Sequence, residues 1–288
     1  MLDQAYRLRQ MATEGGPAET ETDKPKIITV TSGKGGVGKS NFVVNLSITL
    51  QKMGKKVLIF DADVGMGNDD VLMGFLPKYN VFDIIFNGKE IDDIIMTGPF
   101  GVKLLPGGSG ITKISELTNT QRNKFIDKLS NLTGFDYIIM DTGAGINRSV
   151  LGFIASCEEL IIITTPEPTA LMDAYSLVKA VNHFKLKTSA KVVINRAMDE
   201  KEGQETFNKF KGAVTNFLKL NVDYLGSISE DKKLVQSVRN QQPFVIAHPN
   251  CDASKDISKI AKNIIGTMSE SKGVGIQGLF NKIFNIFS

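Results

Sequence analysis

The sequence predicts a doubly wound α/β protein whose mostly parallel sheet has about seven or eight strands. Short β-branched runs alternate with longer mixed segments from about residue 25 to residue 268. Several runs are apolar at every position, which is typical of strands covered on both faces, and repeated strand–helix units build parallel sheets. The expected strands are Lys26–Thr31, Lys56–Phe60, Val102–Leu105, Asp136–Met140, Glu159–Ile163, Lys191–Ile194 and Asp223–Ser227. The expected helices include Lys39–Met53, Thr120–Leu132, Thr169–Phe184 and Asp256–Met268.

Two terminal segments flank this central domain. Residues 1–24 begin with a short helical pattern and continue through Ala12–Lys24, which has no large apolar residue and predicts a flexible linker. Residues 269–288 end in an apolar-rich stretch, Ile276–Phe287. We therefore expect three parts: an arm with a linker (1–24), one α/β domain (25–268) and a tail helix (269–288).

Composition excludes several classes of protein. The 34 basic and 31 acidic residues leave a net charge of +3, so no strong field favours nucleic acid, and no nucleic-acid partner is expected. Cys157 and Cys251 are far apart, which argues against a disulfide, a zinc site or a cluster. The first thirty residues have no apolar run and no stretch reaches about 18 apolar residues, so we expect a cytoplasmic protein without a secretory signal or membrane span.

A phosphate-binding loop is the strongest motif. Gly33-Lys34-Gly35-Gly36-Val37-Gly38-Lys39-Ser40 matches GxxxxGK[ST] between an expected strand and an expected helix. The glycines allow backbone N–H groups to surround phosphates, Lys39 reaches the β- and γ-phosphates, and the Ser40 hydroxyl can ligate Mg²⁺. The motif predicts ATP with Mg²⁺ as the ligand.

Acidic residues follow two further apolar strands. Asp61 and Asp63 come directly after Val57–Phe60, and Asp141 ends Tyr137–Met140. Carboxyl ends of parallel strands meet at the edge where phosphates bind, so these acids are candidates for the Mg²⁺ and phosphate shell. The alternative is that the acids cap their loops.

The loop resembles the deviant Walker A motif of the MinD/ParA ATPases. A second lysine, Lys34, follows the first glycine, and Asn45 lies one helical turn on. The resemblance implies a homodimer around two ATP molecules, in which Lys34 crosses to the partner's nucleotide. It also implies that Asp63 orients the attacking water and that Asp61 supports the Mg²⁺ shell. Asn41 stands where the family most often has Thr, and Gly143 where it usually has Pro.

The resemblance extends to recognition of the base. It implies that Asn195 reads the adenine edge with Arg196 nearby, and that a loop containing Glu230 and Asp231 closes over the base. A turn-forming Asn at the end of a strand is the alternative reading of Asn195.

The N-terminal arm narrows the resemblance. Asp3-Gln4-Ala5-Tyr6-Arg7-Leu8-Arg9 is similar to the DQAxxLR arm of the FlhG (YlxH/FleN) family of flagellar number and placement regulators. This implies activation of the signal-recognition-type GTPase FlhF, with Gln4 in the working role, and contacts with flagellar switch-ring proteins. The alternatives are a MinD-type division-site ATPase and a ParA-type DNA-segregation ATPase.

The tail carries one apolar stripe. The stripe has helical spacing and consists of Ile276, Leu279, Phe280, Ile283, Phe284 and Phe287. It resembles the C-terminal membrane-targeting helix of MinD-type proteins, which implies peripheral binding to a lipid surface in the ATP state. The alternative is a terminal helix packed on the domain in its resting state.

Overall fold

A computed structural model of the chain describes residues 24–63, 69–108, 117–129, 132–267 and 275–287. The predicted activating residues Asp3, Gln4, Ala5, Leu8 and Arg9 lie outside this part of the chain. Within it, no helix has the length and apolar character needed to cross a membrane.

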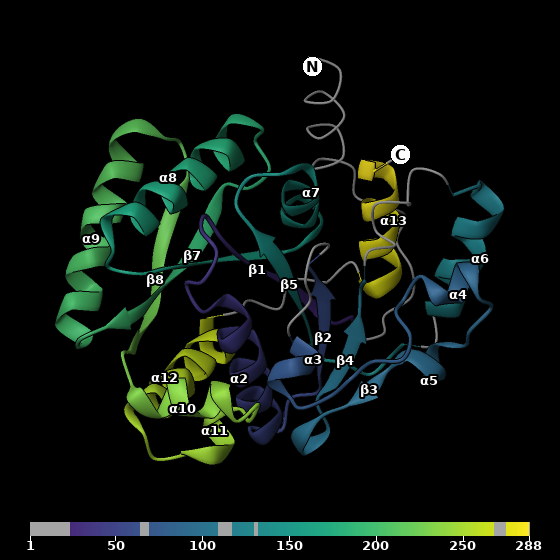
Figure 1. Ribbon diagram of the computed structural model, residues 1–288. Coiled ribbons are helices and arrows are strands. Elements are labelled where there is room, and N and C mark those ends of the chain that lie inside the picture. Colours follow the sequence, from purple (N-terminus) through teal and green to yellow (C-terminus); the bar gives the residue numbers. More distant parts are fainter. Residues whose placement is uncertain (1–23, 64–68, 109–116, 130–131, 268–274, 288) are drawn as a thin grey trace.

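An eight-stranded sheet forms the centre of the molecule, in the order β3-β4-β2-β5-β1-β6-β7-β8 (Figure 1). Its strands are β1 (Lys26–Ser32), β2 (Val57–Ala62), β3 (Met96–Thr97), β4 (Lys103–Pro106), β5 (Tyr137–Ala144), β6 (Glu159–Thr164), β7 (Ser189–Ala197) and β8 (Asn221–Ser229). Only the β3–β4 pair is antiparallel among the described strands. The predicted doubly wound, mostly parallel sheet is confirmed.

Two differences from the expected strands have simple causes. β3 was not predicted, because two residues are too few to show a period of two. β7 runs from Ser189 to Ala197, beyond the expected Lys191–Ile194, because its pairing with β8 continues through polar positions that carry no apolar pattern.

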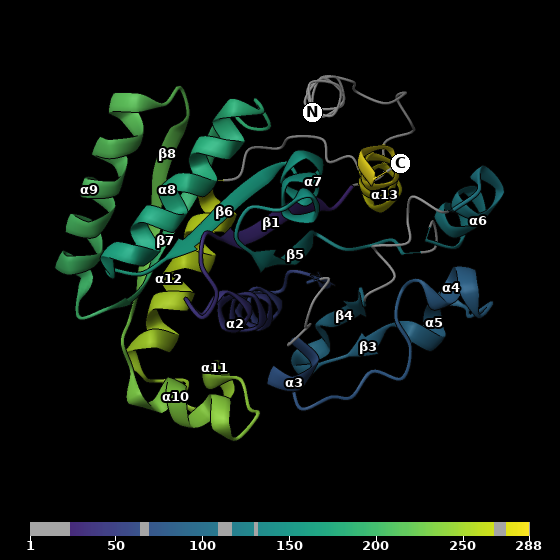
Figure 2. The same ribbon diagram turned by 45° about the horizontal axis from the view of Figure 1, so that its top comes forward.

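Helices cover both faces of the sheet (Figure 2). They are α2 (Lys39–Lys52), α3 (Asp69–Leu72), α4 (Asp83–Phe86), α5 (Ile91–Ile94), α6 (Asn119–Leu129), α7 (Arg148–Ser156), α8 (Pro168–His183), α9 (Glu200–Phe217), α10 (Lys232–Arg239), α11 (Phe244–Ala247), α12 (Asp252–Thr267) and α13 (Gly275–Phe287). A 3-10 turn covers Pro99–Gly101. Helices α2 and α12 lie on one face, and α7, α8 and α13 lie on the other (Figures 1 and 2).

Successive residues of the central strands enter opposite layers of the core. Ile27 and Ile138 pack in the layer that contains α7, α8 and α13, whereas Ile28 and Ile139 pack in the layer that contains α2 and α12. All four side chains are almost fully buried. This placement explains why the strands are apolar at every position rather than at alternate ones.

The tail helix α13 packs into the first of these layers, between α7 and α6 (Figures 1 and 2). The ring centroids of Phe280 and Phe60 are 5.3 Å apart, and those of Phe284 and Phe125 are 5.4 Å apart. The described side chains of the predicted stripe are all at most 5% exposed: Ile276, Leu279, Phe280, Ile283 and Phe284.

The stripe therefore does not face outward in this structure, which shows the packed terminal helix that was the alternative for the resting state. The expected binding of α13 to lipid in the ATP state stays a prediction. The physical reason is that the aromatic stripe fills the sheet face between α7 and α6, where it buries apolar surface that would otherwise meet water.

Candidate nucleotide site

The phosphate-binding loop connects β1 to α2, as predicted. Gly38, the residue before the helix, has a φ of 92°, a left-handed conformation that glycine adopts without strain. A Cβ added to Gly33 would lie 2.2 Å from the backbone carbon of Asp173, so only glycine allows α8 to approach the loop this closely. The loop thus ends in a helix N-terminus, where free N–H groups favour an anion.

Lys39 lies inside the site. Its Nζ is 2.5 Å from Oδ1 of Asp141, and the two side chains are 8% and 1% exposed. The sequence predicted both residues as parts of one nucleotide and metal site, and the structure brings them together. Register explains how, because Asp141 on β5 pairs with Val30 on β1 and with Asp61 on β2.

The acids at this edge are electrostatically crowded. Burial, followed by the charge of Asp141, raises the pKa of Asp61 from an ordinary 3.8 to about 7. Asp69, the first residue of α3, is fully buried, and burial followed by Asp141 and Asp61 holds its pKa well above the usual range. The edge therefore concentrates more acidic groups than its one buried lysine can neutralise.

The donor set fits Mg²⁺. Ser40 in the first turn of α2, Asp61 and Asp141 offer oxygen ligands, and both carboxylate oxygens of Asp69 lack a hydrogen-bond partner. In the described part of the chain, no group of three or more His, Cys, Asp or Glu residues could hold a metal alone. The oxygen donors of Ser40, Asp61 and Asp141 suit Mg²⁺, which takes one or two carboxylates and completes its shell with phosphates and water.

Asp63 is half-buried beside the carboxyl end of β5. Its backbone N–H donates to Oδ1 of Asp61 over 3.2 Å. A Cβ built on Gly143 would lie 3.4 Å from Oδ1 of Asp63, so the residue that follows β2 is in contact with the end of β5. The structure thus places the predicted water-orienting acid at the same edge as Asp61 and Asp141.

Lys34 reaches away from these acids. Its Nζ donates to Oγ1 of Thr169 over 3.0 Å and lies 3.6 Å from Oε2 of Glu167. The Lys34 side chain is 41% exposed. The two lysines of one loop therefore have separate partners, with Lys39 turned inward and Lys34 turned toward the start of α8.

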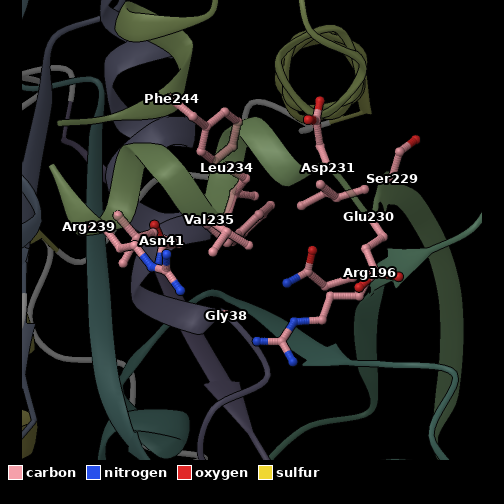
Figure 3. Close-up of a pocket in the computed structure, with 14 residues that line it drawn as sticks. Gly38, Asn41, Arg196, Ser229, Glu230, Asp231, Leu234, Val235, Arg239 and Phe244 are labelled. Carbon is pink, nitrogen blue, oxygen red and sulfur yellow. The ribbon is translucent and has the colours of Figure 1, made fainter. Parts of the chain in front are cut away.

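A cavity of about 480 Å³ lies beside the phosphate-binding loop (Figure 3). Leu234 and Val235 of α10 and Phe244 form an apolar side, and Arg196 lies across from Phe244 (Figure 3). The residues predicted to contact or close over the base all line the cavity: Asn195, Arg196, Glu230 and Asp231. Asn41, which follows the phosphate-binding motif, lines it as well. The size and the mixed lining suit a purine nucleoside.

Several lining residues also have structural partners. Nδ2 of Asn195 donates to the carbonyl oxygen of Val37 over 2.7 Å, and Arg196 donates to that of Gly36 over 2.9 Å. The side chain of Asp231 caps α10 by accepting from the N–H of Lys233. Asn195 and Arg196 thus hold the phosphate-binding loop at the same time as they line the cavity.

Sequence reasoning missed several residues of the site. Thr169 and Glu167, which hold Lys34, are brought there by the packing of α8 and carry no local signal. Leu234, Val235 and Val238 follow a helical apolar spacing that could have suggested one wall of the cavity. Asp69 has a weaker signal, since it begins an acidic pair eight residues after Asp61.

Comparisons with known proteins agree with this geometry. The family described as AAA domain matches residues 25–194. The antiactivator FleN of Pseudomonas aeruginosa is 35% identical over 83% of this chain and 86% of its own. The flagellum site-determining protein YlxH of Helicobacter pylori is 33% identical over 98% of both chains. The septum site-determining protein MinD of Pyrococcus horikoshii, solved with Mg-ADP, is 25% identical, with a TM-score of 0.65 over 83% of this chain and 96% of that one.

Fold and site together define a P-loop ATPase of the MinD/ParA type, and the chain belongs to that family. Within it, the chain is most like the FlhG type, the group of FleN and YlxH.

Proposed function

We propose that the chain is an ATPase switch that dimerises with ATP and regulates flagellar number and placement. The observation that carries the switch is the separation of the two lysines. Lys39 is buried with Asp141, whereas Lys34 is partly exposed at the mouth of the same loop. A lysine that turns away from its own acids is available to a nucleotide held by a second copy.

Hydrolysis within each site requires Lys39 to exchange Asp141 for phosphate oxygens. Ser40, Asp61 and Asp141 would hold Mg²⁺, which neutralises charge on the transferred phosphoryl group. Asp63, half-buried beside Gly143, would orient the attacking water. The cavity lined by Asn195 would take the base. Turnover of ATP is expected to be slow, because the cycle serves to switch the protein between partners rather than to produce ADP.

The role of Lys34 is tested by measuring the molar mass of the protein in solution. In an Asp63→Ala background with ATP, we expect light scattering to show a dimer, and Lys34→Ala to leave a monomer that still binds ADP. The control is Lys179→Ala, which changes an exposed lysine of α8. An ATP-dependent dimer of the Lys34 variant would contradict the assignment.

The likeness to YlxH over 98% of both chains supports the flagellar role, because it covers nearly the whole length of the chain. We propose that the arm, with Asp3, Gln4, Ala5, Leu8 and Arg9, stimulates the GTPase FlhF, and that flagellar switch-ring proteins are further partners. Deletion of Met1–Met11 or Gln4→Ala should remove stimulation of GTP turnover and leave ATPase activity intact. Gln10→Ala, just outside the motif, is the matched control, and stimulation that survives the deletion would refute the arm's role.

Reversible membrane binding through α13 completes the proposal. Phe280 packs against Phe60, which directly precedes Asp61 in β2, and Arg148 of α7 donates to the carbonyl oxygen of Ile286 over 2.9 Å. Because α7 begins four residues after the end of β5, which contacts Asp63, changes at the nucleotide can reach the helix. Two released tails on one dimer would raise avidity by about 10²–10⁴-fold over a single weak tail.

A division-site ATPase is the alternative, and the likeness to the Pyrococcus horikoshii MinD supports it. A pull-down from cells with the full chain and with the Met1–Met11 deletion distinguishes the two. Arm-dependent capture of a signal-recognition-type GTPase supports the flagellar role, and its absence supports the alternative.

A further inference from the structure

Arg196 interrupts β7 at the point where the strand reaches the nucleotide site. From Asn195 to Ala197 the pairing with β8 advances by one residue while β7 advances by two, so Arg196 is an extra residue that forms a bulge. Its φ is 57°, a left-handed conformation that costs free energy for most residues other than glycine. Surrounding contacts have to maintain such strain, and strained residues cluster at functional sites. The bulge is therefore a candidate functional feature.

The bulge brings two successive side chains onto the same loop. In a regular strand, successive side chains point to opposite faces of the sheet. Here Nδ2 of Asn195 donates to the carbonyl oxygen of Val37 over 2.7 Å. The next side chain, Arg196, donates through Nη2 to the carbonyl oxygen of Gly36 over 2.9 Å. A Cβ added to Gly38 would lie 2.2 Å from Nδ2 of Asn195, so the loop is also packed against this strand end.

These two hydrogen bonds fix the directions of two backbone N–H groups. The peptide bonds of the described residues are all trans, so the C=O and N–H of each one point in opposite directions. The carbonyl oxygens of Gly36 and Val37 point to β7, and the N–H groups of Val37 and Gly38 therefore point away from it. Neither N–H has a hydrogen-bond acceptor in the part of the chain that the structure describes. Free N–H groups in such a loop are the donors that hold phosphate oxygens.

We propose that Arg196 is a positioning residue for the phosphates, which acts through the carbonyl group of Gly36 and not by contact with the base. Asn195 acts in the same way through Val37. The inference rests on the proposed nucleotide site and needs neither the dimer nor hydrolysis. It differs from the expectation that Arg196 lies against the base. The free-energy cost of the left-handed backbone is offset because the loop already has its binding conformation when the nucleotide arrives.

The experiment separates binding of the phosphates from binding of the base. The affinities of full-length wild type and Arg196→Ala are measured with Mg²⁺ for a fluorescent ADP, and for inorganic tripolyphosphate and adenosine by its displacement. We expect the variant to bind ADP and tripolyphosphate about 10-fold more weakly and adenosine within about 2-fold of wild type. Arg196→Lys keeps a charged donor and should restore most of the affinity. The control is Lys233→Ala, which removes an exposed positive charge of α10 outside the cavity lining.

Proteolysis of the ligand-free protein supplies a second readout. Endoproteinase Lys-C cuts after lysine, and the Lys34 side chain in the loop is 41% exposed. Cleavage after Lys34 should be faster in Arg196→Ala, because the loop has lost a contact that holds it. Arg196→Gly adopts the left-handed conformation without strain, so it should show the same losses even if the Ala variant folds poorly.

Each alternative gives a different result. Weaker binding of ADP and adenosine with unchanged binding of tripolyphosphate would place Arg196 on the base and overturn this inference alone. Weaker binding of tripolyphosphate with unchanged cleavage after Lys34 would also overturn it, because Arg196 would then contact the phosphates directly. Equal affinities in wild type and both variants that lack the guanidinium group would overturn it as well. A wild type that binds neither ADP nor tripolyphosphate would overturn the proposed nucleotide site itself.

Discussion

The carboxyl edge of the sheet and the face under α13 use the same strands in opposite ways. In β2, Phe60 packs against Phe280 of the tail, and the next residue, Asp61, lies in the acidic edge. The edge holds buried charge in excess of its partners, including the unpartnered Asp69. The face under α13 is apolar, and its residues pack fully against one another.

This difference indicates how each region responds to a ligand. Buried acids without enough counter-charge destabilise the ligand-free edge, so binding of a cation with phosphates there releases free energy that can support a conformational change. The apolar side chains of the tail helix are already buried in the core, so the proposed release of the helix requires free energy from another part of the molecule. The short path through Phe60 and α7 offers the route, and the predictions below test each side of the comparison.

The largest expected effect lies on the apolar side. Phe280→Ala removes a 1% exposed ring that touches Phe60 and Phe125, and should lower the free energy of unfolding by about 3–5 kcal/mol. Asn281→Ala, on the exposed side of the same helix, should change it by less than about 0.5 kcal/mol. Urea unfolding measures both, and similar values for the two variants would show that α13 is not packed in solution.

The acidic side should show itself in pH dependence. Asp61 loses its proton near 3.8 when unfolded and near 7 when folded, so the folded state holds more protons between these values. The free energy of unfolding of the metal-free protein should therefore fall as pH rises from about 4 to 7 and level off above 7. At about 1.36 kcal/mol per pKa unit, Asp61 contributes at most about 4 kcal/mol.

Asp61→Asn isolates this contribution. The variant should lose most of the slope and keep a remainder from Asp69, whose pKa is raised in the same direction. Urea unfolding in EDTA across this range measures the difference, with Asp92→Asn, which changes an exposed acid of α5, as the control. If the free energy of unfolding of the Asp61 variant falls with pH as steeply as that of wild type, the pKa of Asp61 is not raised in the folded protein.

The smallest effect concerns the hydrogen bond between α7 and the tail helix α13, which lies on the proposed route from the acidic edge to the tail. Arg148→Gln should weaken the bond to the carbonyl oxygen of Ile286 and cost about 1–2 kcal/mol. Hydrogen exchange at the α13 amides should quicken, while Arg148→Lys, which keeps the charge, should give a smaller change. Unaltered exchange in both variants would remove Arg148 from the proposed route.

The sequence was informative where chemistry is local and silent where it depends on packing. The phosphate-binding loop, Asp61 and Asp141 follow from short patterns at strand ends. Asp69 could not be assigned, because its burial depends on how α3 packs. The tail stripe was predicted correctly as a helix. One apolar helix face fits a protein core and a lipid surface equally well, so the pattern alone could not show that α13 packs on the sheet beside Phe60.

The central claim is that nucleotide state at the edge controls the tail. Its most direct test is sedimentation with vesicles of phosphatidylethanolamine and phosphatidylglycerol, using Asp63→Ala with ATP or ADP. The control is Asp63→Ala with Lys34→Ala, in which the tail is intact. We predict that Asp63→Ala pellets with vesicles in ATP only and that the double variant stays in the supernatant. Equal binding in ATP and ADP would contradict the account.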